Sequence, residues 1–201
     1  MRLYLVRHPQ TVVPADICYG SSDVEAALQE QMHMVAALTA ASTPPHAGLD
    51  SREAVPKIML PRGLAMYSSP LRRCAEVAKR LAERLECTSL SFDARLAEMH
   101  FGRWELQAWD DIPRSEVDAW AQDLTGYQPG GGESVLQMAE RVCAFYQELL
   151  QTGSDSIVVC HAGTIRMFLA CGQDRSVTEL ALQAAKNPRK ISYGELIVLQ
   201  C

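Results

Sequence analysis

The sequence lacks a long hydrophobic run, a closely spaced cysteine pair and an excess of positive charge. No stretch of about eighteen apolar residues occurs, and the apolar stretch near the N-terminus is too short for a signal peptide, so we expect a cytoplasmic protein without a membrane partner. The seven cysteines form an odd set without a C-x-x-C pair, which argues against a disulfide framework or a zinc ribbon and predicts free thiols. The net charge of -5 does not provide the basic field of a nucleic-acid-binding protein, so no nucleic acid partner is expected.

Short apolar segments alternate with helical patterns along the chain. Strands are expected at about 2–6, 64–68, 90–93, 156–160 and 194–199, and helices at about 24–41, 71–86, 133–151 and 163–171. This alternation predicts an α/β fold, a three-layer α/β/α sandwich around a mainly parallel sheet. The length favours a single domain over residues 1–201. The less regular residues 99–132 are expected to form a small cap, and the proline-bearing stretch 42–61 a loop.

Charged side chains follow the expected strands at the points where the strands end. Arg7 and His8 come directly after the first strand, and His161 comes directly after a second strand near the C-terminus. Ligands of open α/β sheets bind beyond the carboxyl ends of the strands, so the two imidazoles are expected to meet there. Arg72, in the first turn of the helix that follows another strand, is expected at the same end of the sheet. Its neighbour Arg73 is expected to be an ordinary surface residue.

This set of residues is suited to phosphoryl transfer. A phosphate monoester brings about two negative charges, and catalysis consists largely of holding it in line and neutralising its oxygens. Arg7 and Arg72 offer planar, bidentate donors, and Gly163 begins a helix whose free N–H groups favour an anion. His8 is the expected nucleophile, because neighbouring arginines lower the pKa of an imidazole and keep one nitrogen unprotonated. His161 is expected to donate a hydrogen bond to the transferred group.

The leaving alkoxide also needs a proton, and Glu98 is the expected donor. It follows the strand at about 90–93, which places it near the same end of the sheet. The function of its neighbour His100 is open, because this ring could line the substrate pocket or simply cover apolar surface.

Two rival sites use some of the same residues. The run from Cys160 to Arg166 has the form C-x-x-G-x-x-R, which resembles the loop of cysteine-dependent phosphatases, with Cys160 as nucleophile and Arg166 as phosphate clamp. A hydrolytic metal site could instead use His8, His161 and His100 together with acids, although no H-x-x-x-H spacing is present. We therefore expect no metal and no cofactor.

Four separated segments, in order along the whole chain, resemble the signature of the histidine phosphatase superfamily, also called the phosphoglycerate mutase-like family. They are Arg7-His8, Ser68 to Arg73, Glu98 to Glu105 and His161 to Arg166. The resemblance implies a phosphoglycerate mutase-like fold and a metal-independent phosphomonoesterase with a small-molecule phosphate ester as substrate. It also implies that His8 becomes a phosphohistidine, that Arg7, Arg72 and His161 hold the phosphate, and that Glu98 is the proton donor.

Two further segments are similar to the α-ribazole phosphatase branch of this superfamily, which acts in cobalamin assembly. They are residues 18–24 and 101–105. The resemblance implies that Tyr19, Gly20 and Ser21 line the substrate pocket and that α-ribazole 5′-phosphate is the substrate.

Other functions stay open at this point. A phosphoglycerate mutase is the alternative enzyme, although mutases of this superfamily are longer, and a broad-specificity sugar or nucleotide phosphatase is another. Pro9 and Gln10 stand where Gly and Glu are usual, so a non-catalytic phospho-ligand-binding protein is the alternative of another class. A homodimer through an exposed apolar face is also left open.

Overall fold

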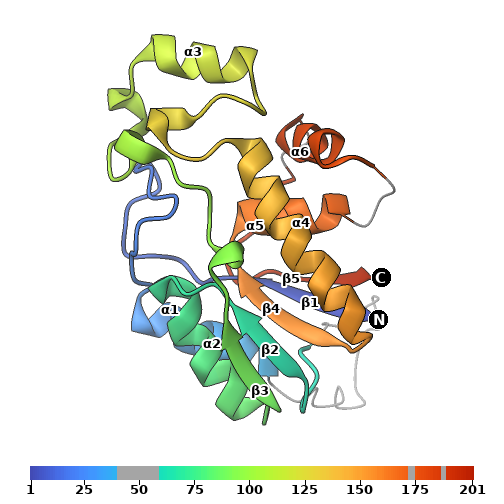
Figure 1. The fold of residues 1–201 in the computed structure, drawn as a ribbon. Coiled ribbons are helices and arrows are strands. Elements are labelled where there is room, and N and C mark those ends of the chain that lie inside the picture. Colours follow the sequence, from blue (N-terminus) through green and yellow to red (C-terminus); the bar gives the residue numbers. More distant parts are fainter. Residues whose placement is uncertain (40–58, 172–174, 187–188) are drawn as a thin grey trace, which may run out of the picture.

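A mainly parallel sheet forms the centre of the molecule (Figure 1). The computed structural model describes residues 1–39, 59–171, 175–186 and 189–201. Within these residues the sheet has five strands, which lie in the order β3 (Ser89–Phe92), β2 (Ala65–Ser68), β4 (Ser156–Cys160), β1 (Arg2–Arg7) and β5 (Leu196–Gln200). The first four strands are parallel to their neighbours, and β5 is antiparallel to β1. The predicted α/β class and the strand positions are confirmed.

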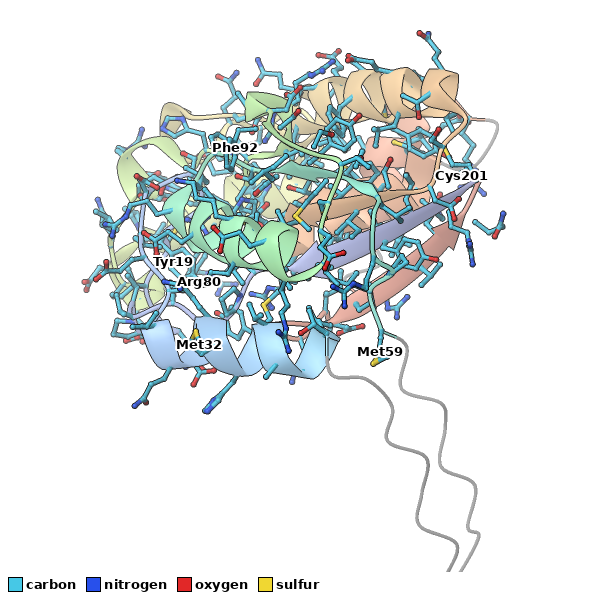
Figure 2. All side chains as sticks on the ribbon, turned by 90° about the horizontal axis from the view of Figure 1, so that it is seen from below. Tyr19, Met32, Met59, Arg80, Phe92 and Cys201 are labelled. Atoms are coloured by element: carbon cyan, nitrogen blue, oxygen red, sulfur yellow. The ribbon has the colours of Figure 1, made fainter. Side chains whose placement is uncertain are left out.

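Helices cover both faces of this sheet. One face carries α1 (Leu28–Thr39) and α2 (Arg72–Arg84), which lie side by side in Figure 2, with Arg80 between them. The other face carries α4 (Val135–Thr152), α5 (Ala162–Cys171) and α6 (Val177–Lys186). None of the helices in the described ranges is long and apolar enough to cross a membrane.

The two faces follow from the alternation of side chains along the strands. In β1, Tyr4 and Val6 pack in the core beneath α1 and α2, whereas Leu3 and Leu5 pack beneath α4, α5 and α6. Successive side chains of a strand point to opposite faces, so a strand that is apolar throughout must be covered on both sides. This buried apolar run is why the three-layer arrangement could be predicted.

Two details of the predicted helices need correction. No helix was predicted after residue 171, yet α6 is present, and its buried face is formed by Leu180, Ala181 and Ala184. These apolar residues recur at helical spacing, so this helix could have been expected from the sequence. The loop predicted at 42–61 falls mostly on residues 40–58, which lie outside the described residues.

Residues 99–132, predicted to be irregular, contain the short helix α3 (Arg114–Gln122) and lie beyond the carboxyl end of the sheet (Figure 1). Two glycines hold the two ends of this segment together. Gly102 and Gly130 both have a positive φ. A Cβ atom on Gly102 would overlap the backbone at Gly130, and a Cβ atom on Gly130 would overlap the backbone on either side of Gly102. Glycine is the residue that permits both the left-handed conformation and this close approach.

Candidate active site

The carboxyl ends of β1, β2 and β4 bring the predicted site residues together. The backbone N–H of His8 donates to the carbonyl of Cys160 at 3.0 Å, and that of Ser69 donates to the carbonyl of Val159 at 3.0 Å. These bonds extend the sheet past the strand ends and fix the residues that follow them. The rings of His8 and His161 meet edge to face, with centroids 5.1 Å apart. The predicted meeting of the two imidazoles is confirmed.

The contacts of His8 assign its tautomer and leave one nitrogen free. Its Nδ1 lies 2.7 Å from the carbonyl oxygen of Pro9, which can only accept, so Nδ1 carries the proton and Nε2 keeps its lone pair. Burial lowers the pKa of His8 well below its usual value, and the charges of Arg73 and Arg7 lower it further. The ring is 2% exposed and lines a cavity, so a neutral Nε2 is available as a nucleophile.

The unusual Pro9 does not disturb this arrangement. The bond to His8 uses the carbonyl group, which proline keeps, and the missing N–H is not needed there. Gln10, the second departure from the usual pattern, has an exposed side chain. Neither residue removes a contact from the nucleophile.

His161 is held at both ring nitrogens by buried side chains. The guanidinium Nε of Arg73 donates to Nδ1 at 3.2 Å, and because arginine cannot accept, Nδ1 is unprotonated and Nε2 carries the proton. Nε2 lies 2.8 Å from the hydroxyl of Ser69. Burial lowers the pKa of His161 well below its usual value, and the charge of Arg73 lowers it further. His161 is therefore a neutral Nε2–H donor next to His8, and its contact with phosphate stays a prediction.

The arginine assignment within the helix after β2 was wrong, because the site contains Arg73 and not Arg72. Arg73 is fully buried and lines the cavity beside His8, and it also donates to the carbonyls of Gly20 at 2.5 Å and Ser22 at 2.7 Å. Arg72 instead points outward. Consecutive residues of a helix are about 100° apart around its axis, so only one of the two side chains can face the strand ends.

Arg72 forms a surface ion-pair network instead. Its side chain is 49% exposed and pairs with Glu25 at 2.6 Å and with Glu76 at 3.1 Å. Such exposed pairs contribute little to stability. Arg72 is therefore outside the site.

Arg7, the other arginine of the site, is oriented by the aromatic ring of Tyr193, which was not predicted to belong to the site. Its guanidinium carbon lies 3.9 Å from the centroid of the Tyr193 ring, and its Nη1 donates to the carbonyl of Ile191 at 2.5 Å. The Tyr193 hydroxyl is 2.9 Å from that of Tyr19, and its ring centroid is 5.6 Å from that of His8. Tyr193 precedes β5, the strand that pairs with β1, and this pairing was the signal for its location.

Glu98 reaches the site at the N-terminus of α5. Its Oε2 accepts from the backbone N–H of Gly163 at 3.0 Å, and its Oε1 accepts from the N–H of Met99 at 3.1 Å. A Cβ atom on residue 163 would overlap the Glu98 carboxyl group, so a larger residue there would displace that group. The N-terminus of α5 thus already holds the Glu98 carboxyl group. Its contact with phosphate stays a prediction.

Arg141 on α4 fixes the chain that carries Glu98. Its guanidinium donates to the carbonyls of Arg95, Ala97 and Glu98 at 2.7, 2.8 and 3.3 Å. A bidentate ion pair with Glu133 holds the same guanidinium from the other side. This bracing leaves the Glu98 carboxylate little freedom to move away from the site.

The predicted pocket residues separate into two groups. Tyr19 and Gly20 line the cavity next to His8, whereas Ser21 and the exposed His100 line a second hollow behind Glu98. Ser21 donates through its N–H to Glu105 at 2.8 Å, and Glu105 also accepts from the N–H of Phe101 at 2.9 Å. Glu105 thus connects the loop at Gly20 to Ser22, whose carbonyls Arg73 binds, to the 99–132 segment.

The cavity above His8 has a volume of about 580 Å³. Arg7, His8, Arg73 and Glu98 line one end of it, and residues of the 99–132 segment and of α6 line the other. Two guanidinium groups, a carboxyl group and a neutral histidine in a largely apolar cavity are an arrangement that can bind a phosphate group and attack its phosphorus.

The structure contradicts the thiol alternative. Cys160 is fully buried in the core beneath α5, and burial raises the pKa of its thiol well above the usual value, so no thiolate faces the cavity. Arg166, the other residue of that motif, does line the cavity. For the alternative metal site, no group of three or more His, Cys, Asp or Glu side chains suited to a metal ion is found among the described residues.

The two buried histidines should make the fold sensitive to acid. Because their pKa values are lowered in the folded chain, the unfolded chain binds more protons below about pH 6.5, and the free energy of unfolding falls as the pH falls. Between about pH 6.5 and 5.5 each histidine should contribute a slope of about 1 kcal/mol per pH unit, because the unfolded imidazole is only partly protonated in this range. Urea unfolding over this range should show the slope of two histidines in wild type and about half of that sum in His161→Asn. His33→Gln, at an exposed position on α1, should keep the full slope. Equal slopes in wild type and His161→Asn would contradict the buried neutral state.

Comparison with known proteins gives a family and several relatives. The model of the histidine phosphatase superfamily (branch 1) matches residues 3–187. A metal-independent phosphoserine phosphatase from Arabidopsis thaliana is 30% identical over 133 residues, which are 63% of this chain and 56% of that protein. The chain spans about half the length of the curated relatives that it matches.

Solved structures share the fold over nearly the whole chain. A mycobacterial glucosyl-3-phosphoglycerate phosphatase in complex with VO3 has a TM-score of 0.72 at 25% identity, covering 99% of this chain and 90% of that one. The α-ribazole phosphatase from Shigella flexneri has a TM-score of 0.74 at 19% identity, covering 100% of this chain and 90% of that one. The predicted phosphoglycerate mutase-like fold is confirmed, since a phosphoglycerate mutase from Thermus thermophilus is also among these structures.

Proposed function

Because the chain belongs to the histidine phosphatase superfamily, we propose that it is a phosphomonoesterase that passes phosphate through His8 to water. The observation that carries the proposal is the neutral His8, whose Nδ1 is bound to Pro9 and which lines the cavity together with Arg7 and Arg73. The two guanidinium groups would neutralise the phosphate oxygens as the phosphorus approaches Nε2. His161 would donate its Nε2–H to the same group in place of the Ser69 hydroxyl, which Nε2 contacts at 2.8 Å in the structure.

The proposed reaction has two steps. In the first, Nε2 of His8 attacks phosphorus, the ester P–O bond breaks, and the carboxylic acid of Glu98 gives its proton to the leaving oxygen. In the second, the Glu98 carboxylate takes a proton from water, which attacks the phosphohistidine and releases phosphate. The residues named here supply every group and proton that these steps require, so the proposal includes no metal and no cofactor.

α-Ribazole 5′-phosphate is our candidate substrate, which would place the protein in cobalamin synthesis in the cytoplasm. Support comes from the residues around Tyr19 and Phe101 that resemble this branch, and both side chains line the cavity. Named relatives act on other esters, phosphoserine and glucosyl-3-phosphoglycerate, so those are the competing substrates. We also propose that residues 99–132 act as a cap within a single domain.

Phosphate release in the presence of a chelator tests this function. The panel contains α-ribazole 5′-phosphate, phosphoserine, glucosyl-3-phosphoglycerate, 3-phosphoglycerate, sugar phosphates and nucleotides. We expect release without added metal and the highest kcat/KM on α-ribazole 5′-phosphate. Release from other esters alone would keep the reaction and remove that substrate. Interconversion of phosphoglycerates without phosphate release would indicate a mutase, and binding without turnover a phospho-ligand-binding protein.

A further inference from the structure

Apart from its charged residues and histidine, the cavity is lined mainly by apolar and aromatic side chains. Phe101, Trp109, Val117, Trp120 and Leu124 line it from the 99–132 segment. On the opposite wall the cavity is lined by methionine and alanine side chains of α4, α5 and α6. We call this part of the cavity the apolar chamber. It belongs to the same cavity as the phosphate end, so a group esterified to the phosphate can extend into it.

Aromatic contacts hold the wall of the apolar chamber in place. The ring of Phe101 meets the rings of Trp109 and Trp120 edge to face, each with centroids 5.8 Å apart. Trp120 in turn meets the buried Trp104 at 5.9 Å, and Trp104 Nε1 donates to Glu116 at 2.6 Å. Edge-to-face contacts of this kind favour defined ring orientations, so the wall is a preformed surface for an apolar ligand.

Charge is scarce in the apolar chamber. Among the described residues that line the cavity, the acid is Glu98, and Arg7 and Arg73 belong with it to the phosphate end. The remaining charged side chain is Arg166, whose Nε donates to the carbonyl of Arg189 at 3.1 Å. A free ammonium group on the substrate would therefore meet no carboxylate in the chamber, and an uncompensated charge is costly to desolvate.

We propose, on the basis of the function proposed above, that the apolar chamber selects phosphate esters of alcohols that carry a flat aromatic group. Trp109 and Trp120 provide faces and edges against which such a group packs, and the chamber offers few polar groups to replace the water lost by an amino acid or by a sugar that carries no aromatic group. The aromatic wall thus acts on the substrate's leaving group, while the phosphate end carries out the reaction.

Three esters with primary alkyl leaving groups test the proposal: 2-(1-naphthyl)ethyl phosphate, ethyl phosphate and O-phospho-L-serine. The naphthyl group is separated from the ester oxygen by two carbons, so the naphthyl and ethyl esters differ in apolar contact rather than in leaving-group acidity. We expect kcat/KM for the naphthyl ester to exceed that for ethyl phosphate by about 100-fold or more, because even one methylene in an apolar pocket is worth about 10-fold or more. Equal values for the two esters would overturn the proposal.

Trp109→Ala identifies the wall responsible. Trp109 is 40% exposed, so its replacement should leave the fold intact, and it should lower kcat/KM for the naphthyl ester by about 10-fold, mainly through KM, without affecting ethyl phosphate. Leu106→Ala is the control, because Leu106 belongs to the same segment, is 60% exposed and does not line the cavity. An unchanged preference in Trp109→Ala would overturn the assignment to this wall.

Arg166→Met separates the proposal from its main competitor. If the enzyme prefers phosphoserine and this variant removes the preference, Arg166 binds a substrate carboxylate and the aromatic proposal is overturned. If no ester is turned over, the proposed function fails first, and calorimetric binding of the naphthyl and ethyl esters to the wild-type protein then decides the inference. Tighter binding of the naphthyl ester would support the apolar chamber, and equal binding would overturn it.

Discussion

Replacement of His8 by alanine is expected to lower kcat/KM by about 10⁴-fold or more, the range of losses when a nucleophile is removed from an enzyme. Among the residues that the structure describes, the side chains next to His8 are not suited to take over its function. The neighbouring imidazole, His161, is bound at Nδ1 by Arg73 and at Nε2 by Ser69, so it presents a proton rather than a lone pair. Cys74 and Cys160 nearby are fully buried thiols whose pKa values are raised by burial.

The measurement is a steady-state assay together with rapid acid-free quenching after mixing with phosphate-labelled ester. Wild type should incorporate label into a base-stable, acid-labile phosphoenzyme, and His8→Ala should incorporate none. His33→Ala, which replaces an exposed histidine on α1, should label and turn over like wild type. Labelled His8→Ala protein would assign the nucleophile to another residue.

The arrangement of layers could be predicted because it depends on patterns that are local in the sequence. The apolar runs within β1 and β4 must be buried on both faces, and the helices between strands supply the cover. The α6 helix was missed although its buried residues Leu180, Ala181 and Ala184 recur at helical spacing. The interior of the 99–132 segment was missed too, because its structure depends on tertiary contacts such as that between Gly102 and Gly130.

The strand-end histidines could be predicted because, like the strands, they follow from patterns that are local in the sequence. Side chains that reach the site through tertiary contacts could not be predicted in this way. Tyr193 reaches Arg7 because β5 pairs antiparallel to β1, and Arg141 reaches the Glu98 chain from α4. The choice between Arg72 and Arg73 depends on where α2 begins, and a shift of one residue turns the side chain by about 100°. Sequence patterns place helix ends only to within a few residues.

These neighbouring arginines provide the second large effect. Arg73→Ala should lower kcat/KM by about 10³-fold or more, the range found when an arginine that stabilises a transferring phosphoryl group is removed. Arg72→Ala should change it by less than about threefold, since the exposed ion pairs of Arg72 with Glu25 and Glu76 are worth little. The two variants carry the same chemical change one residue apart, which makes each the control for the other.

Arg73 also lowers the pKa of His8, so the pH profile of its variants distinguishes the loss of a catalytic group from damage to the fold. Its charge helps to lower the pKa of His8, so removing it should raise that pKa and move the acid limb of the kcat/KM profile to higher pH. Arg73→Lys keeps the positive charge but not the forked guanidinium that binds His161, Gly20 and Ser22. Compared with Arg73→Ala, it should bring the acid limb back toward its wild-type pH but recover little of kcat/KM.

Thermal unfolding of all three variants shows how much stability is lost with the two carbonyl contacts, each worth about 1–3 kcal/mol. A large loss in Arg72→Ala with wild-type rates in Arg73→Ala would reverse the assignment of the phosphate-binding arginine.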